Sequence, residues 1–498
     1  MALDEGIIDR DVDAERNGLV RGLGLLSSTT IVAGSMIGSG IFIVSSDIAR
    51  QLGSPGWLLV VWVLTGLLTL AAALSYGELA AMFPRAGGQY VYLREAFGPL
   101  SAFLYGWALF LVIQTGTIAA VAIAFARFLG VLWPAIGPEH LLLDFGLLEV
   151  AGIGFLSLSL STQQLTAILV IVVLTASNLT GLHTGRWIQD TFTIAKVGAL
   201  LGLIGLGLLV ERHPGAAIAS ADFWTPVHAG AVVSIPALVP LLATAMVGAL
   251  FSADAWNNVT FTAGEVKDPE RNIPLSMALG VGVVTLLYVL ANVVYLSALP
   301  IEAIQTAPQD RVGVVAAEAI MGANAELIMA IAIMVSCFGC NNGMILAGAR
   351  VYFSMARDGL LFRPIGRLNR FRVPGIALLL QALWTIVLTL PRTYDPASGA
   401  YGNLYGNLLD YIIFTVLVFY IATIAGLMVL RRKRPHAVRP YRAFGYPWLP
   451  MAYIVVAGFI CVVLLMAEKT RFNAVTGLVL VLAGLPAYYL WQRLRRAG

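Results

Sequence analysis

The chain has 498 residues, of which 59% are hydrophobic and only 12% are charged. Soluble domains are about 45–50% apolar and about 25% charged, so this composition excludes an ordinary soluble protein and indicates a polytopic membrane protein. The net charge of +4 says little by its total, and a nucleic-acid partner is not expected.

A bilayer core needs about 20 apolar residues per helix. Cutting the chain at polar, proline and glycine clusters predicts twelve spans, at residues 25–50, 57–82, 98–130, 164–182, 188–210, 238–263, 274–298, 325–355, 374–391, 408–430, 448–467 and 473–492. Residues 1–24 lack the apolar core of a signal peptide, so we expect a cytoplasmic N-terminal segment there.

The placement of basic residues supports this count. With the N-terminus inside the cell, 23 of the 31 Lys and Arg residues fall in the expected cytoplasmic segments, and six fall in outer loops. This asymmetry follows the positive-inside rule, which an error of one span would invert. We therefore expect a multi-pass protein of the plasma (inner) membrane with both termini in the cytoplasm.

The expected fold is an all-α integral membrane protein built from two blocks of five helices. The first block covers residues 25–210 and the second 238–430, with an outer loop at 211–237 between them. Because five is odd, the second block must be inverted relative to the first. A basic cytoplasmic loop at 431–447 leads to two extra helices and a short tail at 448–498.

The first span of each block contains a break. Residues 34–42 read GSMIGSGIF, and residues 251–258 read FSADAWNN. Unwound backbone at membrane depth is tolerated only where it lines a cavity or is buried in protein, and a matched pair of such breaks marks the substrate site of secondary transporters. The alternative for the first break is tight packing of small residues between helices.

An unwound first break can bind both charges of a zwitterion. The N–H groups of Gly38, Ser39 and Gly40 would begin a new half-helix, whose positive dipole end can hold a carboxylate. Carbonyl groups near Ser35 to Ile37 would face a substrate ammonium. No charged side chain is needed for this arrangement.

The second break adds an aromatic ring and an acid. Phe251 can cover a cavity, and Asp254 is an ionisable residue inside an apolar segment. Asp254 has two open interpretations. It caps a half-helix that restarts at Trp256, or it is the counter-ion of a cationic substrate.

Lys196 is expected near the middle of the bilayer. It lies ten residues after Arg186, which is about 15 Å along a helix. Snorkelling to the helix end is the alternative, but the reach is long. We expect the ammonium to point into the bundle, where it replaces a bound cation or loses its proton during transport.

The remaining polar residues carry no predicted chemistry. Glu78, Asp190 and Glu265 lie at cytoplasmic ends, where we expect contacts with Arg or Lys. The five histidines show no metal-ligand spacing, and no cofactor is expected. The three cysteines lie in apolar stretches, which argues against a disulfide framework.

Together these segments resemble the amino acid–polyamine–organocation superfamily, and within it the L-type amino-acid transporter group. The motifs that carry the resemblance are 34–42, 76–79 (YGEL), 83–90 (FPRAGGQY), 189–192 (QDTF) with Lys196, 251–256, 265–269 (EVKDP), and 336–343 (SCFGCNNG) with 349–350.

The resemblance implies twelve helices, a five-plus-five inverted repeat with discontinuous helices 1 and 6, and alternating access. It implies that Gly38, Ser39 and Gly40 hold the substrate carboxylate and that Phe251 is the gating aromatic. Lys196 matches the lysine that stands where sodium-coupled relatives bind a cation. The other implied substrate contacts are the carbonyls of Met36, Ile37, Phe251 and Ser252, the break residues Ala253 and Asp254, and a side-chain pocket at Ser336, Cys340 and Thr117 to Ala120.

Two features depart from the family pattern. Ala253 and Ala255 stand where relatives often have tyrosine and glycine, which leaves side-chain selectivity open. The outer loop at 131–163 lacks the cysteine through which animal relatives bind an accessory glycoprotein, so no disulfide-linked ancillary subunit is expected.

We expect a sodium-independent transporter of neutral L-amino acids that works by exchange or uniport, with proton coupling left open. The first alternative is a transporter of cationic amino acids or polyamines that uses Asp254. The second is an amino-acid sensor without flux. An enzyme is not expected, because the chain has neither HExxH nor a Ser–His constellation.

Overall fold

The structure is a computed structural model that describes residue 19 and residues 21–150, 154–210, 214–228, 230–322, 325–395, 400–401 and 404–497. The expected segment 1–24 lies largely outside these residues. The helices of the first half are α2 (Leu25–Met36), α3 (Gly40–Leu52), α4 (Pro55–Met82), α5 (Gln89–Phe97), α6 (Pro99–Ala108), α7 (Gln114–Leu132), α8 (Thr162–Leu179) and α9 (Leu182–Leu209).

The second half is also mostly helical. Its helices are α10 (Ile235–Ser252), α11 (Asn258–Phe261), α12 (Pro269–Ala298), α13 (Ile301–Gln305), α14 (Val312–Met321), α15 (Ala325–Arg357), α16 (Gly375–Leu388), α17 (Leu404–Lys433), α18 (Trp448–Met466), α19 (Glu468–Leu482) and α20 (Gly484–Ala497).

Eleven helical segments of the described chain are long and apolar enough to cross a membrane, and they match eleven of the twelve expected spans. The exception is the span expected at 374–391. There the structure has α16, whose 14 residues cover about 21 Å at 1.5 Å per residue. It ends at Leu388 because the chain continues as a strand from Pro391.

The expectation of an all-α protein misses two small sheets. Strands β1 (Leu141–Val150), β2 (Gly154–Ser161), β5 (Pro391–Asp395) and β6 (Ala400–Tyr401) form an antiparallel sheet in that order. A two-stranded sheet pairs β3 (Val227–His228) with β4 (Ala231–Val232). The larger sheet joins the segment before α8 to the segment after α16, because β2 pairs with β5.

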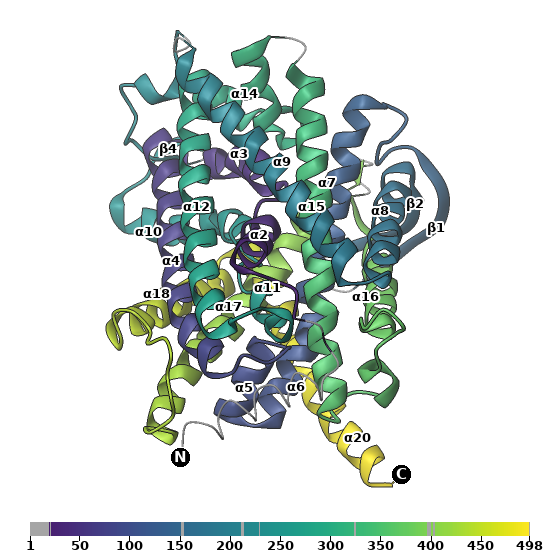
Figure 1. Cartoon of the computed structure of the whole chain (residues 1–498). Helices are drawn as coiled ribbons and strands as arrows, with labels where there is room; N and C mark the ends of the chain where they lie inside the picture. The colour runs from purple at the N-terminus through teal and green to yellow at the C-terminus, as the bar shows by residue number, and fades with distance from the viewer. Residues whose placement is uncertain are drawn as a thin grey trace.

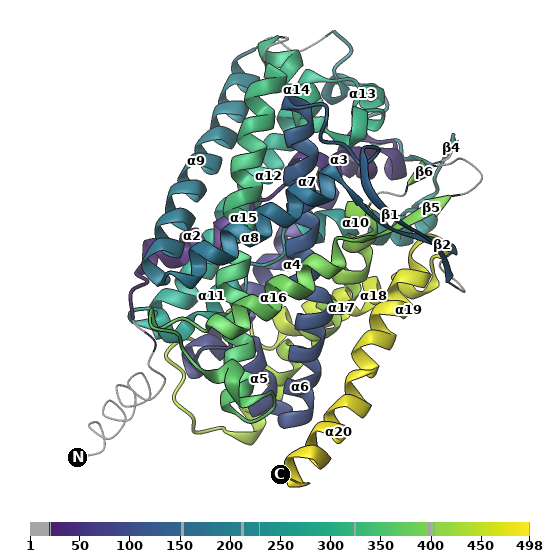
Figure 2. The ribbon, with the colours of Figure 1, turned by 90° about the vertical axis from the view of Figure 1, so that its right-hand side faces the viewer.

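The first span lies at the centre of the bundle. Its apolar window is 94% buried, whereas that of the last span, at α19 and α20, is 28% buried. Helix α2 packs against α9, α12 and α15, and α3 packs against α10 and α14. In Figures 1 and 2, α14 lies at one end of the molecule, α5, α6 and α20 lie at the other, and α2 lies between them.

Candidate functional site

The first break lies where the glycine pattern predicts it. Helix α2 ends at Met36, Ile37 adopts an extended conformation with φ −75° and ψ 93°, and α3 begins at Gly40. Residues 36–40 are all buried. The first N–H groups of a helix have no intrahelical acceptor, so those at the start of α3 can bind an anion.

Lys196 donates to the backbone of this break. Its ammonium group contacts the carbonyl oxygen of Gly34, that of Ile37 at 2.7 Å and that of Ser336 at 3.3 Å. A lysine ammonium has three N–H donors, so these three carbonyls can use all of them. The side chain is 2% exposed, which excludes snorkelling to the helix end.

Two side chains of α15 satisfy further carbonyls of the break. The Ser336 hydroxyl contacts the carbonyl oxygens of Ile37 at 3.0 Å and Gly38 at 3.2 Å. The Cys340 thiol donates to the carbonyl of Ser35 at 2.9 Å. The polar atoms of the two expected pocket residues are thus directed at the unwound backbone.

The second break begins where α10 ends at Ser252. Asp254 N donates to Phe251 O at 3.1 Å, and Ala255 has a left-handed φ of 63°, which is rare for a residue with a side chain. The chain becomes helical again at Asn258 as α11. The expected restart at Trp256 is therefore two residues too early.

A single tyrosine contacts both breaks. The hydroxyl group of Tyr288, on α12, lies 2.9 Å from the carbonyl oxygen of Met36 and 3.0 Å from that of Ser252. These two carbonyls end the helices α2 and α10, so the two half-helices converge on one point. The sequence did not single out Tyr288.

The two breaks also pack directly against each other. A β-carbon placed on Gly40 would lie 2.0 Å from Ser252 Oγ and 3.1 Å from Ser252 Cα. Glycine is therefore required at this contact. A β-carbon on Gly34 would meet the side chains of Gln189 and Thr193 at 2.1 and 2.2 Å, so the packing alternative also holds for this part of the motif.

Asp254 is held by a tyrosine rather than by capping. It is 7% exposed, and its Oδ1 accepts a hydrogen bond of 2.6 Å from the Tyr420 hydroxyl. The residue at the N-cap of α11 is Asn257, not Asp254. No ion pair of Asp254 with Lys or Arg is found within the described ranges.

Two small cavities meet at Asp254. One has a volume of about 20 Å³ and is lined by side chains of α7, α15, α17 and the second break, including Thr117, Asp254 and Tyr420. The other, also of about 20 Å³, is lined by Ala253 and Asp254 together with α4, α17 and α18. Each has room for about one water molecule, so a larger solute could enter only if the surrounding helices move.

The other expected site residues are buried near these elements. Ala120 lies one turn after Thr117 on α7 and is fully buried. Phe251 is 6% exposed in the last turn of α10, next to Ser252.

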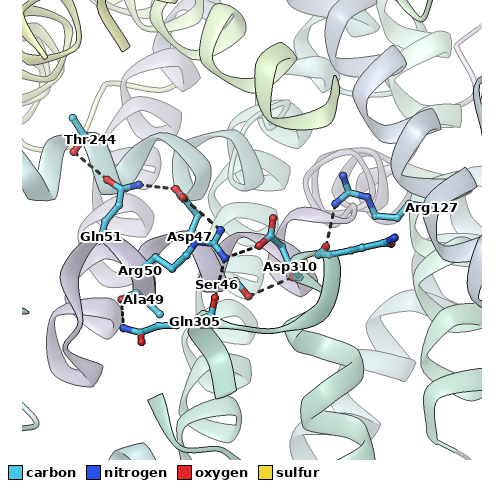
Figure 3. Close-up of polar contacts among 10 residues, drawn as sticks. Ser46, Asp47, Ala49, Arg50, Gln51, Arg127, Thr244, Gln305 and Asp310 are labelled. Atoms are coloured by element: carbon cyan, nitrogen blue, oxygen red, sulfur yellow. Dashed lines mark hydrogen bonds and ion pairs between the residues drawn. The ribbon is translucent and has the colours of Figure 1, made fainter. Parts of the chain in front are cut away.

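At the α13–α14 end, polar contacts tie α3 to the second half of the chain (Figure 3). Arg50 pairs with Asp310 at 2.7 Å and donates to Gln305 O at 3.0 Å. Gln51 donates to Asp47 at 2.6 Å and accepts from Thr244 of α10 at 3.2 Å. These contacts hold α3 against α10 and the segment between α13 and α14.

At the opposite end of the molecule, polar contacts attach α2 to α9. Ser27 and Thr30 of α2 both donate to the carboxylate of Asp190 on α9, the first at 2.9 Å. The expected partner of Asp190 was a basic residue, and the structure has two hydroxyl groups instead. Arg186 donates to Gly22 O at 2.7 Å, so the first turns of α2 and the residues just before it are attached to α9.

Glu78 and Glu265 have the basic partners that were expected. Glu265 forms a bidentate pair with Arg350 at 3.0 and 3.1 Å, and both side chains are 1% exposed. Glu78 contacts Arg431 and Arg439 of the basic loop. These ion pairs anchor the α5–α6 end of the bundle.

No metal-binding cluster of three or more His, Cys, Asp or Glu side chains occurs within the part of the chain that the structure describes. All three cysteines are buried free thiols.

Known proteins match this chain over almost its whole length. The family model for amino acid permeases matches residues 23–484. The chain is 30% identical over 480 residues to the large neutral amino acids transporter small subunit 2 of Mus musculus, which covers 95% of this chain and 82% of that protein.

Two further relatives come from different organisms. The Asc-type amino acid transporter 1 of Homo sapiens is 29% identical over 486 residues, covering 96% of this chain and 83% of that protein. The serine/threonine exchanger SteT of Bacillus subtilis (strain 168) is 28% identical over 481 residues, covering 95% of this chain and 98% of that protein.

Proposed function

The chain belongs to the amino acid permease family, and from this premise we propose that it carries neutral L-amino acids across the plasma membrane. The observation that carries the proposal is the convergence of the two half-helix ends, through the carbonyls of Met36 and Ser252, on one buried point. The names of the relatives, which are transporters or exchangers of amino acids, support the substrate class.

The substrate backbone binds to the breaks. The N–H groups of Gly38, Ser39 and Gly40 hold the carboxylate, because they open α3 and its dipole favours negative charge. The carbonyls of Met36, Ile37, Phe251 and Ser252 accept from the ammonium group. Each carbonyl has two lone pairs, so one that accepts a single protein donor can still bind substrate, whereas the Ile37 carbonyl already accepts from Lys196 and Ser336 and is the least available of the four.

The substrate side chain then lies toward α7 and α15. Thr117 and Ala120 of α7, with Ser336 and Cys340 of α15, bound this region, and Ala253 and Asp254 close it from the second break. Phe251 acts as the gate, because it is the last aromatic residue before the unwound backbone.

Lys196 makes transport independent of sodium. Its ammonium occupies the carbonyl cluster of Gly34, Ile37 and Ser336, which a metal cation would need as ligands. A second positive charge 4 Å away would cost about 4 kcal/mol at an effective dielectric constant near 20. Transport then proceeds by exchange or uniport, and loss of the Lys196 proton would couple it to protons.

Alternating access follows from an inverted repeat of residues 25–210 and 238–430, with α18 to α20 as the extra helices. In this topology α16 completes the twelve spans and both termini are cytoplasmic. Asp190 with Ser27 and Thr30 closes the inner side, and Arg50 with Asp310 closes the outer side. A disulfide-linked subunit is not part of the proposal, since all three cysteines are buried.

A cationic substrate is the second candidate, and one observation favours it. Asp254 is a buried carboxylate for which the described residues provide a tyrosine but no Lys or Arg partner. A basic amino acid or polyamine would supply that charge. A sensor that binds an amino acid without moving it is the third candidate.

Counterflow in proteoliposomes separates these functions. Vesicles loaded with unlabelled leucine should accumulate labelled leucine without sodium, and external arginine or putrescine should not compete. Competition by arginine or putrescine alone would favour the cationic substrate. Binding of leucine in a thermal-shift assay without counterflow would favour the sensor.

A further inference from the structure

Asp254 is buried in the second break without a positively charged partner among the described residues. It is 7% exposed, and the Tyr420 hydroxyl, 2.6 Å from Oδ1, gives the only side-chain hydrogen bond that its carboxylate receives within these residues. Moving a carboxylate out of water without a cation beside it is strongly unfavourable. A carboxyl group in this position avoids that cost when it binds a proton, and it then also becomes a hydrogen-bond donor.

The ionisable side chains that surround Asp254 in the described chain add no positive charge. They are tyrosines and one cysteine, carried by different helices: Tyr76 of α4, Tyr105 of α7, Cys340 of α15, Tyr420 of α17 and Tyr453 of α18. Phenol and thiol groups are uncharged near neutral pH. Lys196 directs its ammonium group to the carbonyls of Gly34, Ile37 and Ser336 instead. A proton is therefore the positive charge that fits beside this carboxyl group.

The cavity between α7, α15, α17 and the second break contains another polar group that lacks a partner. Asn258 lines this cavity together with Asp254, is 1% exposed, and its Nδ2 has no hydrogen-bond partner among the described residues. The neighbouring amides do have partners, since Gln89 donates to Thr423 at 3.0 Å and Asn257 donates to Gln89 at 2.9 Å. An unsatisfied buried N–H group costs free energy, so Asn258 requires an acceptor in the cavity.

A single water molecule can serve both groups. The cavity volume of about 20 Å³ is enough for one water, whose oxygen can accept from Asn258 Nδ2 while it contacts the Asp254 carboxyl group. Asp254 also lines the second cavity of about 20 Å³, which is bounded by α4, α17 and α18. The carboxyl group thus has room for water on two sides, as a group that takes up and releases a proton requires.

We propose that Asp254 is a proton-binding site and that the chain carries a proton together with each amino acid. The proton comes from water on one side of the membrane, binds to the carboxylate, and returns to water on the other side, so no further reactant is needed. Asp254 belongs to the second break, whose surroundings must change when the substrate site changes sides. This inference rests on the proposed function, because it takes the movement of an amino acid through the breaks as given. It assigns coupling to Asp254 rather than to Lys196.

The test uses proteoliposomes that contain a pH-sensitive dye, with the membrane potential clamped by potassium and valinomycin. With an acid exterior, vesicles without internal amino acid should accumulate labelled leucine, and added leucine should acidify the lumen. A gradient of about one pH unit drives up to about tenfold accumulation at one proton per leucine. In Asp254→Asn the gradient should drive no accumulation. Each value is divided by the counterflow rate of the same protein, so that a change in leucine binding cancels.

The matched control is Asp222→Asn, which removes an exposed carboxylate in the segment before β3. Asp222→Asn should keep the wild-type ratio of gradient-driven accumulation to counterflow. A wild-type protein with leucine counterflow but without leucine-dependent acidification would overturn the inference and leave the proposed function intact. A wild-type ratio in Asp254→Asn would also overturn it. Absence of counterflow in the wild type would instead contradict the proposed function.

If Asp254→Asn does not yield folded protein, chemical labelling of the wild type provides the second measurement. Dicyclohexylcarbodiimide reacts with protonated carboxyl groups in apolar surroundings, and mass spectrometry locates the modified residue. Asp254 should be labelled, and more strongly in acid buffer. Glu265 is the internal control, because it is equally buried but is paired with Arg350. An unlabelled Asp254, or equal labelling of Asp254 and Glu265, would overturn the proposal.

Discussion

The contact between the two breaks can be tested by adding one methyl group. In Gly40→Ala the new β-carbon would lie 2.0 Å from Ser252 Oγ, 2.7 Å from Ser252 Cβ and 3.1 Å from Ser252 Cα. The hydroxyl group can rotate away, but the Cβ contact can be relieved only if the backbone of one break moves. Overpacking of this kind costs about 1–3 kcal/mol.

If the whole of this free energy is lost from substrate binding, the affinity falls by roughly 5- to 150-fold, since 1.4 kcal/mol corresponds to a factor of ten. The assay is the KM of leucine counterflow, with the thermal midpoint of the purified protein measured alongside. The control is Gly198→Ala on α9, where a β-carbon meets no atom within 4 Å. This control should leave the KM at the wild-type value and should not lower the thermal midpoint, because alanine favours a helix by about 1 kcal/mol over glycine.

A second substitution tests whether the contact with Ser252 causes the loss of affinity in Gly40→Ala. Ser252→Gly removes the two atoms nearest to the new methyl group, so Gly40→Ala with Ser252→Gly should recover part of the lost affinity. A Gly40→Ala protein with wild-type KM and thermal midpoint would refute the close contact of the breaks. Failure of Ser252→Gly to improve Gly40→Ala would refute the steric explanation.

Two further substitutions test the backbone and the cation position. Lys196→Ala should abolish or uncouple leucine transport while folded protein remains in the membrane, because three carbonyl acceptors lose their donor. Wild-type uptake by this variant would contradict the role of Lys196. Ala255→Gly should stabilise the protein by about 1 kcal/mol, since Ala255 has a φ of 63° that costs about 1–2 kcal/mol for a residue with a side chain. Ala253→Gly, at a φ of −94°, should give no such gain, and equal thermal shifts of the two variants would argue against backbone strain.

The position of the breaks was predictable because their chemistry is local. Glycines at 34, 38 and 40 disfavour a continuous helix, and the structure leaves the helix between Met36 and Gly40. The restart of the second break was less predictable. Asp254 suggested a cap, but its carboxylate contacts Tyr420, which is 166 residues away along the chain. Such a contact depends on tertiary packing.

The site residues that could not be predicted from the sequence are those whose role depends on tertiary contacts. Tyr288 looks like any tyrosine in an apolar span, and only the convergence of two carbonyls distinguishes it. By contrast, the strand β2 carried a visible signal. Residues 154–161 read GFLSLSLS, an alternation with the period of a strand, and Ser157 and Ser159 are buried. The expected spans had placed this stretch in the outer loop at 131–163.

The account depends most on one location, where the backbone groups of Gly38 to Gly40 lie against the end of α10 at Ser252. The direct measurement is an experimental structure of the protein with bound leucine. It should place the carboxylate about 3 Å from the N–H groups of Gly38 to Gly40 and the ammonium on the carbonyls of Met36 and Ser252. Leucine bound elsewhere, with these backbone groups unchanged, would contradict the account.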